Sequence, residues 1–366
     1  MDSIGLYIHI PFCKSKCPYC DFYSGKGNDE KYRSYTETLI DKIRYWGQQV
    51  EIKVKSVYFG GGTPSVLGSE LLTKILFEVK NNFTVEPNAE ITVEINPDTG
   101  KTIDFKLLKE AGFNRISIGM QSAVQNELDE LGRIHSANDA KITVIRAKET
   151  GINNISLDLM MGIPHQTLNS LKESIDFCAE CGVTHISSYI LKIEKGTRFY
   201  AARNRLELPD EDMQAELYLF AVDYLKSLGY EQYEISNFAR SGFESKHNIN
   251  YWKCGEYIGI GPSAHSFFNG KRFFYGRSFS DFDKNITAFD CDGGNEEEFI
   301  MLSLRLKSGL VFEEYKEKFG HSVPLPLSRK IHRYADTDFM EIDSQRAFFT
   351  PKGFLVSNTI ICDLIR

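Results

Sequence analysis

The chain has 366 residues, of which 42% are hydrophobic, and its formal net charge at pH 7 is −7. That length suits one large domain with a smaller one attached, and the hydrophobic fraction is ample for a packed core. The negative charge provides no basic field for nucleic acid or an anionic membrane. Because the sequence has neither an apolar run of about 18 residues nor a secretory signal pattern, we expect a cytoplasmic protein with no transmembrane segment.

Eight cysteines in such a chain do not indicate a disulfide framework, because a reducing compartment keeps them as thiols. Cys178 and Cys181 fall in the apolar pattern of a helix, which favours buried side chains over a second metal site. Cys254, Cys291 and Cys362 are scattered, and we expect structural roles for them. The other three cysteines are clustered near the N-terminus and require a different explanation.

Cys13, Cys17 and Cys20 lie within eight residues, in a loop after an apolar strand expected at 5–10. Thiolates with this spacing can each bind a different iron of a [4Fe–4S] cluster, whose usual complete set is four cysteines. The residue two positions after Cys20 is Phe22, so the fourth cysteine is absent. The spacing therefore predicts a cluster with one iron open to a small molecule.

Two other interpretations compete with the cluster. A zinc knuckle could combine the three cysteines with His9, but no second ligand pair follows nearby. Three unliganded thiols in one loop are less favoured still, since clustered cysteines in a reducing compartment usually bind or react. The sequence favours the cluster.

The cysteine loop resembles the C-x3-C-x-aromatic-C signature of radical S-adenosylmethionine (SAM) proteins, with Tyr19 as the aromatic residue. The resemblance implies that the amino and carboxylate groups of SAM chelate the open iron, with Tyr19 in the SAM site. It also implies a reducing electron donor, whose electron splits SAM into methionine and a 5′-deoxyadenosyl radical.

The segments that follow alternate between strands and helices. Six strand-then-helix units predict parallel strands with right-handed crossovers, as an open doubly wound sheet or a partial barrel. The resemblance implies the second of these, the partial (β/α)6 barrel. We expect strands at 54–59, 89–95, 115–119, 155–160 and 185–190, and helices at 29–47, 69–81, 103–111 and 168–181, with two more helices between 124 and 150.

A glycine triplet, Gly60-Gly61-Gly62, follows the second strand and continues into Thr63 and Pro64. Without Cβ atoms, its backbone amides can approach a ligand closely. A glycine triplet alone is as often a tight turn as a site. The resemblance to radical SAM proteins implies that Gly61, Gly62 and Thr63 bind the amino group of SAM.

Further candidate SAM residues stand on or near the expected strands. Glu94 ends a strand, where a carboxylate can accept hydrogen bonds from ribose hydroxyls. Judged by itself, Arg133 would be interpreted as a surface cation. The resemblance implies instead that Arg133 faces the SAM carboxylate, with Gln121 beside it. Asp158 lies in an apolar run and needs a partner, because an unpaired buried charge costs several kcal/mol. Tyr7, otherwise ordinary core, would lie against the cluster or SAM.

Several motifs resemble those of oxygen-independent coproporphyrinogen III dehydrogenases and their relatives. Two departures disfavour that enzyme activity: those enzymes carry a further cysteine two residues after the third, and they have a longer N-terminal extension. The matching segments occur here in family order, at 7–13 (YIHIPFC), 60–64 (GGGTP), 94–97 (EINP) and 157–164 (LDLMMGIP).

Residues 247–252 (HNINYW) resemble the H-N-x-x-Y-W motif of the related HemW-type heme chaperones. A histidine beside two large aromatic residues can provide an axial imidazole and flat surfaces for a macrocycle. The resemblance favours His247 as a heme contact and candidate axial ligand, whereas His265 or Cys254 as ligand is a guess. From the residues alone, a packing role for His247 is the stronger interpretation.

We expect a radical SAM domain at 1–290 and a small C-terminal α+β domain at 291–366. The smaller domain would combine helices, a hairpin and a closing helix in a winged-helix-like arrangement, with a lid or docking role favoured over nucleic-acid binding. Its expected helices are 295–307, 313–320, 327–334 and 351–365, and its expected strands are 339–342 and 347–350.

Two functions remain open. The first is a heme chaperone that binds heme, a [4Fe–4S] cluster and SAM, and transfers heme to acceptor proteins. The second is an oxygen-independent coproporphyrinogen III dehydrogenase, which oxidatively decarboxylates two propionates by radical chemistry. The sequence favours the first, and it leaves SAM cleavage, the electron donor and a homodimer open.

Overall fold

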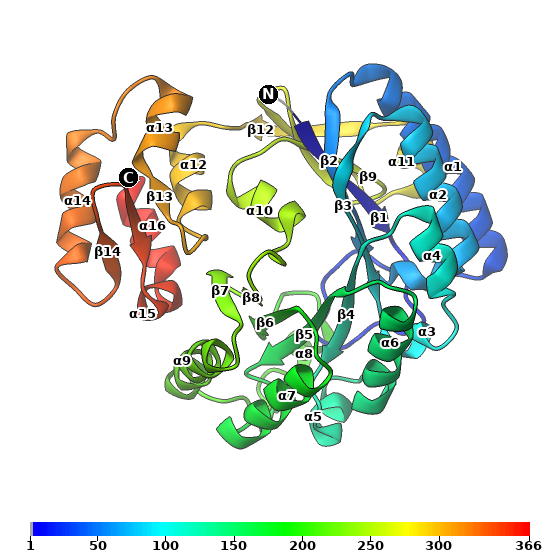
Figure 1. Cartoon of the computed structure of the whole chain (residues 1–366), viewed down its shortest axis with the longest axis horizontal. Coiled ribbons are helices and arrows are strands. Elements are labelled where there is room, and N and C mark those ends of the chain that lie inside the picture. The colour runs from blue at the N-terminus through cyan, green and yellow to red at the C-terminus, as the bar shows by residue number, and fades with distance from the viewer. Residues whose placement is uncertain (1–2) are drawn as a thin grey trace.

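The computed structural model describes residues 3–366, and a curved, largely parallel sheet forms its centre (Figure 1). The first six strands are hydrogen-bonded in chain order, which confirms the predicted parallel α/β arrangement. They are β1 (Ser3–Ile10), β2 (Lys53–Gly61), β3 (Val85–Ile95), β4 (Arg115–Gln121), β5 (Asn154–Met161) and β6 (His185–Ile190).

Helices follow these strands and cover the outer side of the sheet, as Figure 1 shows for α1, α2, α4 and α6. Helix α1 begins where Asn28 accepts a hydrogen bond from the Lys31 amide, and α4 where Asp104 accepts one from the Leu107 amide. The helices are α1 (Asp29–Gln49), the 3-10 turn η1 (Pro64–Leu67), α2 (Gly68–Asn82), α3 (Pro97–Gly100), α4 (Phe105–Ala111), α5 (Gln125–Glu130), α6 (Ala137–Glu149) and α7 (Leu168–Glu180).

The two faces of the parallel strands differ in polarity. Side chains on a strand alternate between faces, and the helix-covered face here is apolar. That face includes Val57, Phe59, Val93, Ile116, Ile118, Leu157 and Ile186, all buried. The concave face is polar and carries Ser56, Tyr58, Glu90, Glu94, Arg115, Ser117, Ser156, Asp158, His185 and Ser187. Since parallel sheets are usually apolar on both faces, this polar interior marks the functional side.

The segment between β6 and residue 292, in which no elements were predicted, extends the sheet at both ends. β8 pairs antiparallel with β6, whereas β9 returns to pair parallel with β1. Because the two ends of the sheet do not pair within residues 3–366, the barrel is partial. The elements are α8 (Arg198–Ala202), α9 (Glu211–Ser227), β7 (Glu231–Glu234), β8 (Asn237–Ala239), α10 (Lys246–Trp252), β9 (Tyr257–Ile260), β10 (His265–Phe268), β11 (Lys271–Tyr275), α11 (Phe279–Asp283) and β12 (Thr287–Asp292).

The C-terminal elements form a separate group, at the left of Figure 1. Their small sheet has the order β13-β15-β14. This order agrees with a winged-helix-like arrangement, which stays a prediction. The predicted domain division at 290/291 falls inside β12 (Thr287–Asp292) and also stays a prediction. The elements are α12 (Glu296–Ser303), β13 (Leu310–Val311), α13 (Phe312–Phe319), α14 (Leu325–Ala335), β14 (Met340–Ile342), β15 (Arg346–Phe349), α15 (Pro351–Leu355) and α16 (Ser357–Leu364).

Two predicted helices in this group were wrong in extent. The helix expected at 295–307 ends at Ser303, because the Arg305 carbonyl accepts a hydrogen bond from the Ile235 amide and draws the chain toward β7. The closing helix expected at 351–365 is interrupted at Val356, which has φ −110° and ψ 14°. This break lets both α15 and α16 place apolar side chains in the core. No helix among residues 3–366 is long and apolar enough to cross a membrane.

Candidate functional site

The glycine triplet and the cysteine loop are held together by backbone hydrogen bonds. The Gly62 amide donates to the Ile10 carbonyl (2.9 Å), and the Thr63 amide donates to the Phe12 carbonyl (2.7 Å). A Cβ atom on Gly62 would lie 2.5 Å from the Phe12 carbonyl oxygen, so only glycine allows this approach. The ends of β1 and β2 therefore bring two motifs that are far apart in sequence into contact.

A cavity of about 430 Å³ opens between the cysteine loop and the polar face of the sheet. It is lined by all three clustered cysteines and by most residues that the sequence assigned to SAM. The predicted residues that line it are Cys13, Cys17, Tyr19, Cys20, Gly61, Gly62, Thr63, Glu94, Gln121, Arg133 and Asp158. Tyr7 and His247 do not line it.

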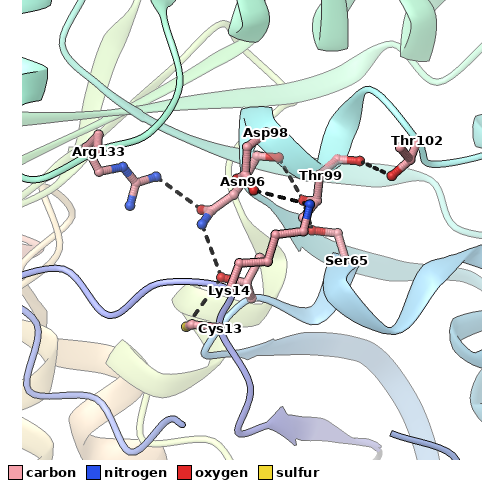
Figure 2. Close-up of polar contacts among 9 residues, drawn as sticks. Cys13, Lys14, Ser65, Asn96, Asp98, Thr99, Thr102 and Arg133 are labelled. Carbon is pink, nitrogen blue, oxygen red and sulfur yellow. Dashed lines mark hydrogen bonds and ion pairs between the residues drawn. The ribbon is translucent and has the colours of Figure 1, made fainter. Parts of the chain in front are cut away.

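Side-chain donors from two loops point at the cysteine sulfurs. The Thr63 hydroxyl donates to Cys13 Sγ (3.5 Å), and Arg133 Nη1 donates to Cys17 Sγ (3.3 Å). Asn96 connects the two, since its Nδ2 donates to Thr63 Oγ1 (3.1 Å) while its Oδ1 accepts from Arg133 Nη2 (3.1 Å). Figure 2 shows this chain running from Arg133 through Asn96 toward Cys13. Such donors stabilise thiolates. Asn96, which connects the two donors, was not predicted as a site residue from the sequence.

A second set of contacts fixes the loop after the glycine triplet against α3. The Ser65 and Thr99 hydroxyls lie 2.6 Å apart, and Thr99 also donates to the Asn96 carbonyl (2.8 Å). Lys14, inside the cysteine loop, forms an ion pair of 3.5 Å with Asp98 (Figure 2). These contacts hold the cysteine loop, the glycine loop and the E-x-N-P segment in fixed relative positions.

Glu94, on β3, lines the cavity and is hydrogen-bonded to β2. Its two carboxylate oxygens accept hydrogen bonds from the Tyr58 hydroxyl (2.8 Å) and the Gly61 amide (3.2 Å). Burial raises the pKa of Glu94 to about 7, against the opposing effect of these donors. Near neutral pH this carboxylate therefore exchanges readily between its charged and neutral forms.

Asp158 has the partners that its apolar sequence context required. Its carboxylate accepts from the Ser117 and Ser156 hydroxyls, each at 3.1 Å. Burial raises the pKa of Asp158, while hydroxyl donors and the nearby Arg115 act in the opposite direction. Serine hydroxyls, rather than an ion pair in direct contact, compensate this buried carboxylate.

Gln121 ends β4 with an unusual backbone conformation. Its φ of 75° lies in the left-handed region, which non-glycine residues seldom adopt. The register of β4 with β5 shifts between Ile118 and Gln121, so the strand end turns toward the cavity. Strain of this kind is concentrated at ligand sites, which agrees with the predicted role of Gln121.

Tyr7 faces His9 rather than the cavity. The Tyr7 hydroxyl lies 2.9 Å from His9 Nδ1, and His9 Nε2 lies 3.1 Å from the Tyr23 carbonyl oxygen. Both ring nitrogens of His9 are thus engaged, which argues against its service as a zinc ligand. Within residues 3–366, no three His, Cys, Asp or Glu groups converge as ligands of one metal ion. Cysteines of a [4Fe–4S] cluster bind separate irons and need not converge in this way.

His247 lies in α10, where its ring packs against Ser56 on the concave face of the sheet. Its Nδ1 is 2.9 Å from Ser56 Oγ, its Nε2 is 2.7 Å from the Tyr251 hydroxyl, and the residue is 1% exposed. Burial lowers its pKa to about 3, so the ring is neutral at pH 7. With both nitrogens engaged, His247 cannot ligate iron in this conformation. Axial ligation of heme iron by His247 stays a prediction, and it requires the ring to release either Ser56 or Tyr251.

Glu90, which sequence analysis missed, fixes the start of α10. Its carboxylate accepts from the Ser245 hydroxyl (3.3 Å), the Lys246 amide (3.0 Å) and the His247 amide (3.0 Å). A carboxylate at a helix N-terminus is favourable because it satisfies free amides and the helix dipole. The available sequence signal was that Glu90 and Glu94, four residues apart on one expected strand, share the same face.

Comparisons with known proteins agree with this geometry. Residues 7–178 match the Radical SAM superfamily, and residues 297–356 match the HemN C-terminal domain. The chain is 34% identical over 372 residues to the heme chaperone HemW of Bacillus subtilis, with 97% of each chain covered. It is 39% identical over 269 residues to the heme chaperone HemW of Escherichia coli, covering 72% of this chain and 70% of the relative.

A solved structure shares the fold. The coproporphyrinogen III oxidase HemN of Escherichia coli superposes with a TM-score of 0.84 over 100% of this chain and 90% of that one. At 19% identity, this likeness concerns the fold alone.

The cysteine loop on a partial parallel barrel, with the superfamily match around it, defines a radical SAM protein. Within that class, 34% identity over 97% of both chains shows that the chain belongs to the HemW family. The resemblance predicted from the sequence is confirmed.

Proposed function

We propose that this protein is a cytoplasmic heme chaperone, which binds heme and transfers it to acceptor proteins. The observation that carries the proposal is the 34% identity to a heme chaperone HemW over 97% of both chains. The absence of a cysteine two residues after Cys20 supports this function over coproporphyrinogen III dehydrogenation.

We further propose that Cys13, Cys17 and Cys20 hold a [4Fe–4S] cluster. All three line one cavity, two of their sulfurs accept hydrogen bonds, and the missing fourth cysteine leaves one iron for SAM. When bound, the cluster supplies an electron, from an external reducing donor, for the cleavage of SAM.

The chain's own residues suit SAM binding in the same cavity. Arg133 presents a planar guanidinium for a carboxylate, and the backbone at Gly61 and Gly62 is accessible to an amino group. Glu94 can accept hydrogen bonds from ribose hydroxyls, and these bonds are strongest when it is ionised. Tyr19, Gln121 and Asp158 line the remaining wall.

The heme contact is proposed to involve α10. Asn248, the residue after His247, lines the cavity, so a macrocycle there would meet α10 at Asn248 before it reached the His247 ring. The H-N-x-x-Y-W resemblance supports this location.

A heme titration followed by Soret absorbance tests the proposal. We expect saturable binding of about one heme per chain, and failure of the wild type to bind would overturn the heme-chaperone function. If His247 is the axial ligand, His247→Ala should weaken binding and shift the Soret band, whereas Tyr251→Phe, which removes only a hydrogen-bond partner of the ring, should not. Unchanged binding by His247→Ala would reduce His247 to a packing residue.

Two further measurements address the cluster and the enzyme alternative. Replacing Cys13, Cys17 and Cys20 together should abolish bound iron and sulfide, and an unchanged content would contradict the cluster assignment. Reduced protein incubated anaerobically with SAM and coproporphyrinogen III should form no protoporphyrinogen. Its formation would overturn a purely carrier function.

A further inference from the structure

Arg115 is a buried cation at the end of the cavity away from the cysteine loop. It is the first residue of β4, it is 2% exposed, and it lines the cavity together with Ser117, Ser187 and Asn248. Arg133, the arginine assigned to SAM, lies at the opposite end, where it donates to Cys17. The cavity therefore has one arginine at each end.

The guanidinium of Arg115 has no direct partner in the described part of the chain. No hydrogen bond or ion pair to it occurs among residues 3–366, and its Nε is buried without an acceptor. A guanidinium carries five N–H donors, and a buried donor that lacks an acceptor destabilises the folded state. An acceptor from a ligand would remove that cost.

The carboxylates that act electrostatically on Arg115 accept hydrogen bonds from other groups. Glu90 accepts from three donors at the start of α10, and Asp158 accepts from Ser117 and Ser156. Burial lowers the pKa of Arg115, but Glu90 and the other acidic groups around it outweigh that effect, so its pKa is raised and it stays charged. Their field keeps the arginine protonated while its donors stay unused.

We propose that Arg115 is an anion-binding residue, which binds a carboxylate of a ligand that enters the barrel. A planar guanidinium matches a carboxylate with two parallel hydrogen bonds, and the Asn248 amide lies on the same cavity wall. The identity of this ligand rests on the proposed function, under which the carboxylate is a propionate of the tetrapyrrole. A free small carboxylate has the same chemistry and is the other source.

The first experiment measures the melting temperature of the full chain in sodium propionate against sodium chloride at equal ionic strength. Propionate should raise the melting temperature of the wild type by about 1 °C or more, since a ligand that binds only the folded state stabilises it. Arg115→Gln should lose this response, and the control Arg203→Gln, which alters an exposed arginine, should keep it. No response in the wild type, or a full response in Arg115→Gln, overturns the inference.

A folding defect would not remove the test. If Arg115→Gln lacks the wild-type circular dichroism spectrum, Arg115→Lys replaces it, because lysine keeps the charge but loses the two-pronged geometry. This variant should show a reduced propionate response, and an unaltered response overturns the inference.

The second experiment identifies the source of the carboxylate. Fluorescence titrations compare protoporphyrin IX with its dimethyl ester, and the absence of iron removes axial ligation from the comparison. Esterification should weaken wild-type binding about tenfold or more, as expected for loss of a charged hydrogen bond. It should leave the affinity of Arg115→Gln unchanged.

The two experiments separate this inference from the proposed function. If the wild type binds neither heme nor either pigment, the heme function fails, and the propionate response alone decides the role of Arg115. If both pigments bind the wild type equally while the propionate response requires Arg115, the subsite is assigned to a small carboxylate. If esterification weakens pigment binding by Arg115→Gln as much as by the wild type, Arg115 is not the residue that binds the propionate.

Discussion

Glu94 is the residue whose charge most directly controls the cavity near neutral pH. Burial raises its pKa to about 7, and the Tyr58 hydroxyl and Gly61 amide hold its two oxygens in place. Ribose hydroxyls donate to a carboxylate, so SAM should bind preferentially when Glu94 is ionised. The affinity of the protein for SAM should then depend on pH near neutrality, where the carboxylate of SAM does not titrate.

We predict that SAM affinity rises between pH 6 and pH 8. The sign follows because the raised pKa leaves Glu94 mostly protonated at pH 6 and mostly ionised at pH 8, where binding is favoured. Calorimetric titration of anaerobically reconstituted protein at several pH values measures this, and Glu94→Gln should bind more weakly with a flatter profile. An equal pH dependence in Glu94→Gln would assign the effect to another group.

Thr63 provides a second prediction at the residue scale. Its hydroxyl donates to Cys13 Sγ and accepts from Asn96, so Thr63→Val removes a donor from a proposed cluster ligand with little change in shape. Hydrogen bonds to cluster sulfurs favour the reduced, more negative state. The midpoint potential of the reconstituted cluster, followed by electron paramagnetic resonance, should therefore become more negative. Ser65→Ala, which alters a hydroxyl bonded to Thr99 instead, is the control.

At the scale of elements, α10 is held at the sheet by Glu90. Three donors at residues 245–247 converge on this carboxylate, and the same turn of the helix places the His247 ring against Ser56. The Glu90 contacts therefore control how firmly α10 closes the cavity wall.

We predict that Glu90→Gln lowers the free energy of unfolding by about 1.5–3 kcal/mol, because charge-assisted hydrogen bonds are replaced by weaker ones or lost. Urea denaturation measures this change, and hydrogen exchange should accelerate at 245–252. Glu86→Gln alters a side chain on the same strand that makes no hydrogen bond among residues 3–366, and it should stay within about 0.5 kcal/mol of the wild type. Equal stability of the two variants would show that α10 is held by packing instead.

At the scale of the whole molecule, the barrel and the C-terminal group share backbone hydrogen bonds. The Ile235 amide donates to the Arg305 carbonyl (3.0 Å), and the Lys307 amide donates to the Tyr233 carbonyl (2.9 Å). Glu298 of α12 also pairs with Arg272 of β11. These contacts continue the edge of the large sheet into the smaller group.

We predict that the two parts unfold in one cooperative transition. Loss of the C-terminal group would leave the edge at β7 with unpaired backbone groups, which disfavours a half-folded intermediate. Scanning calorimetry should give one peak, with calorimetric and van't Hoff enthalpies of similar size. Two resolved peaks would show that the parts are energetically independent.

Much of the fold and site could be predicted from the sequence, because those features are encoded locally. The period of apolar residues indicated alternating strands and helices, and the structure has them. Cysteine spacing alone indicated a cluster with an open iron, which stays a prediction. Asp158 within an apolar run was correctly expected to need a partner. Each inference depended on residues close together in the chain, where backbone geometry limits the arrangements that are available.

Other features were decided only by the tertiary structure, because they depend on segments distant in sequence. Pairing of β9 with β1 brings Tyr257 beside Gly5, and no local pattern specified this return. The unpaired guanidinium of Arg115 and the engaged ring of His247 likewise follow from which strands and helices meet around them. Sequence alone thus determined which chemical groups the chain carries and the periodicity of its elements. The tertiary structure determined which of those groups are already satisfied and which remain available to a ligand, since that depends on long-range packing.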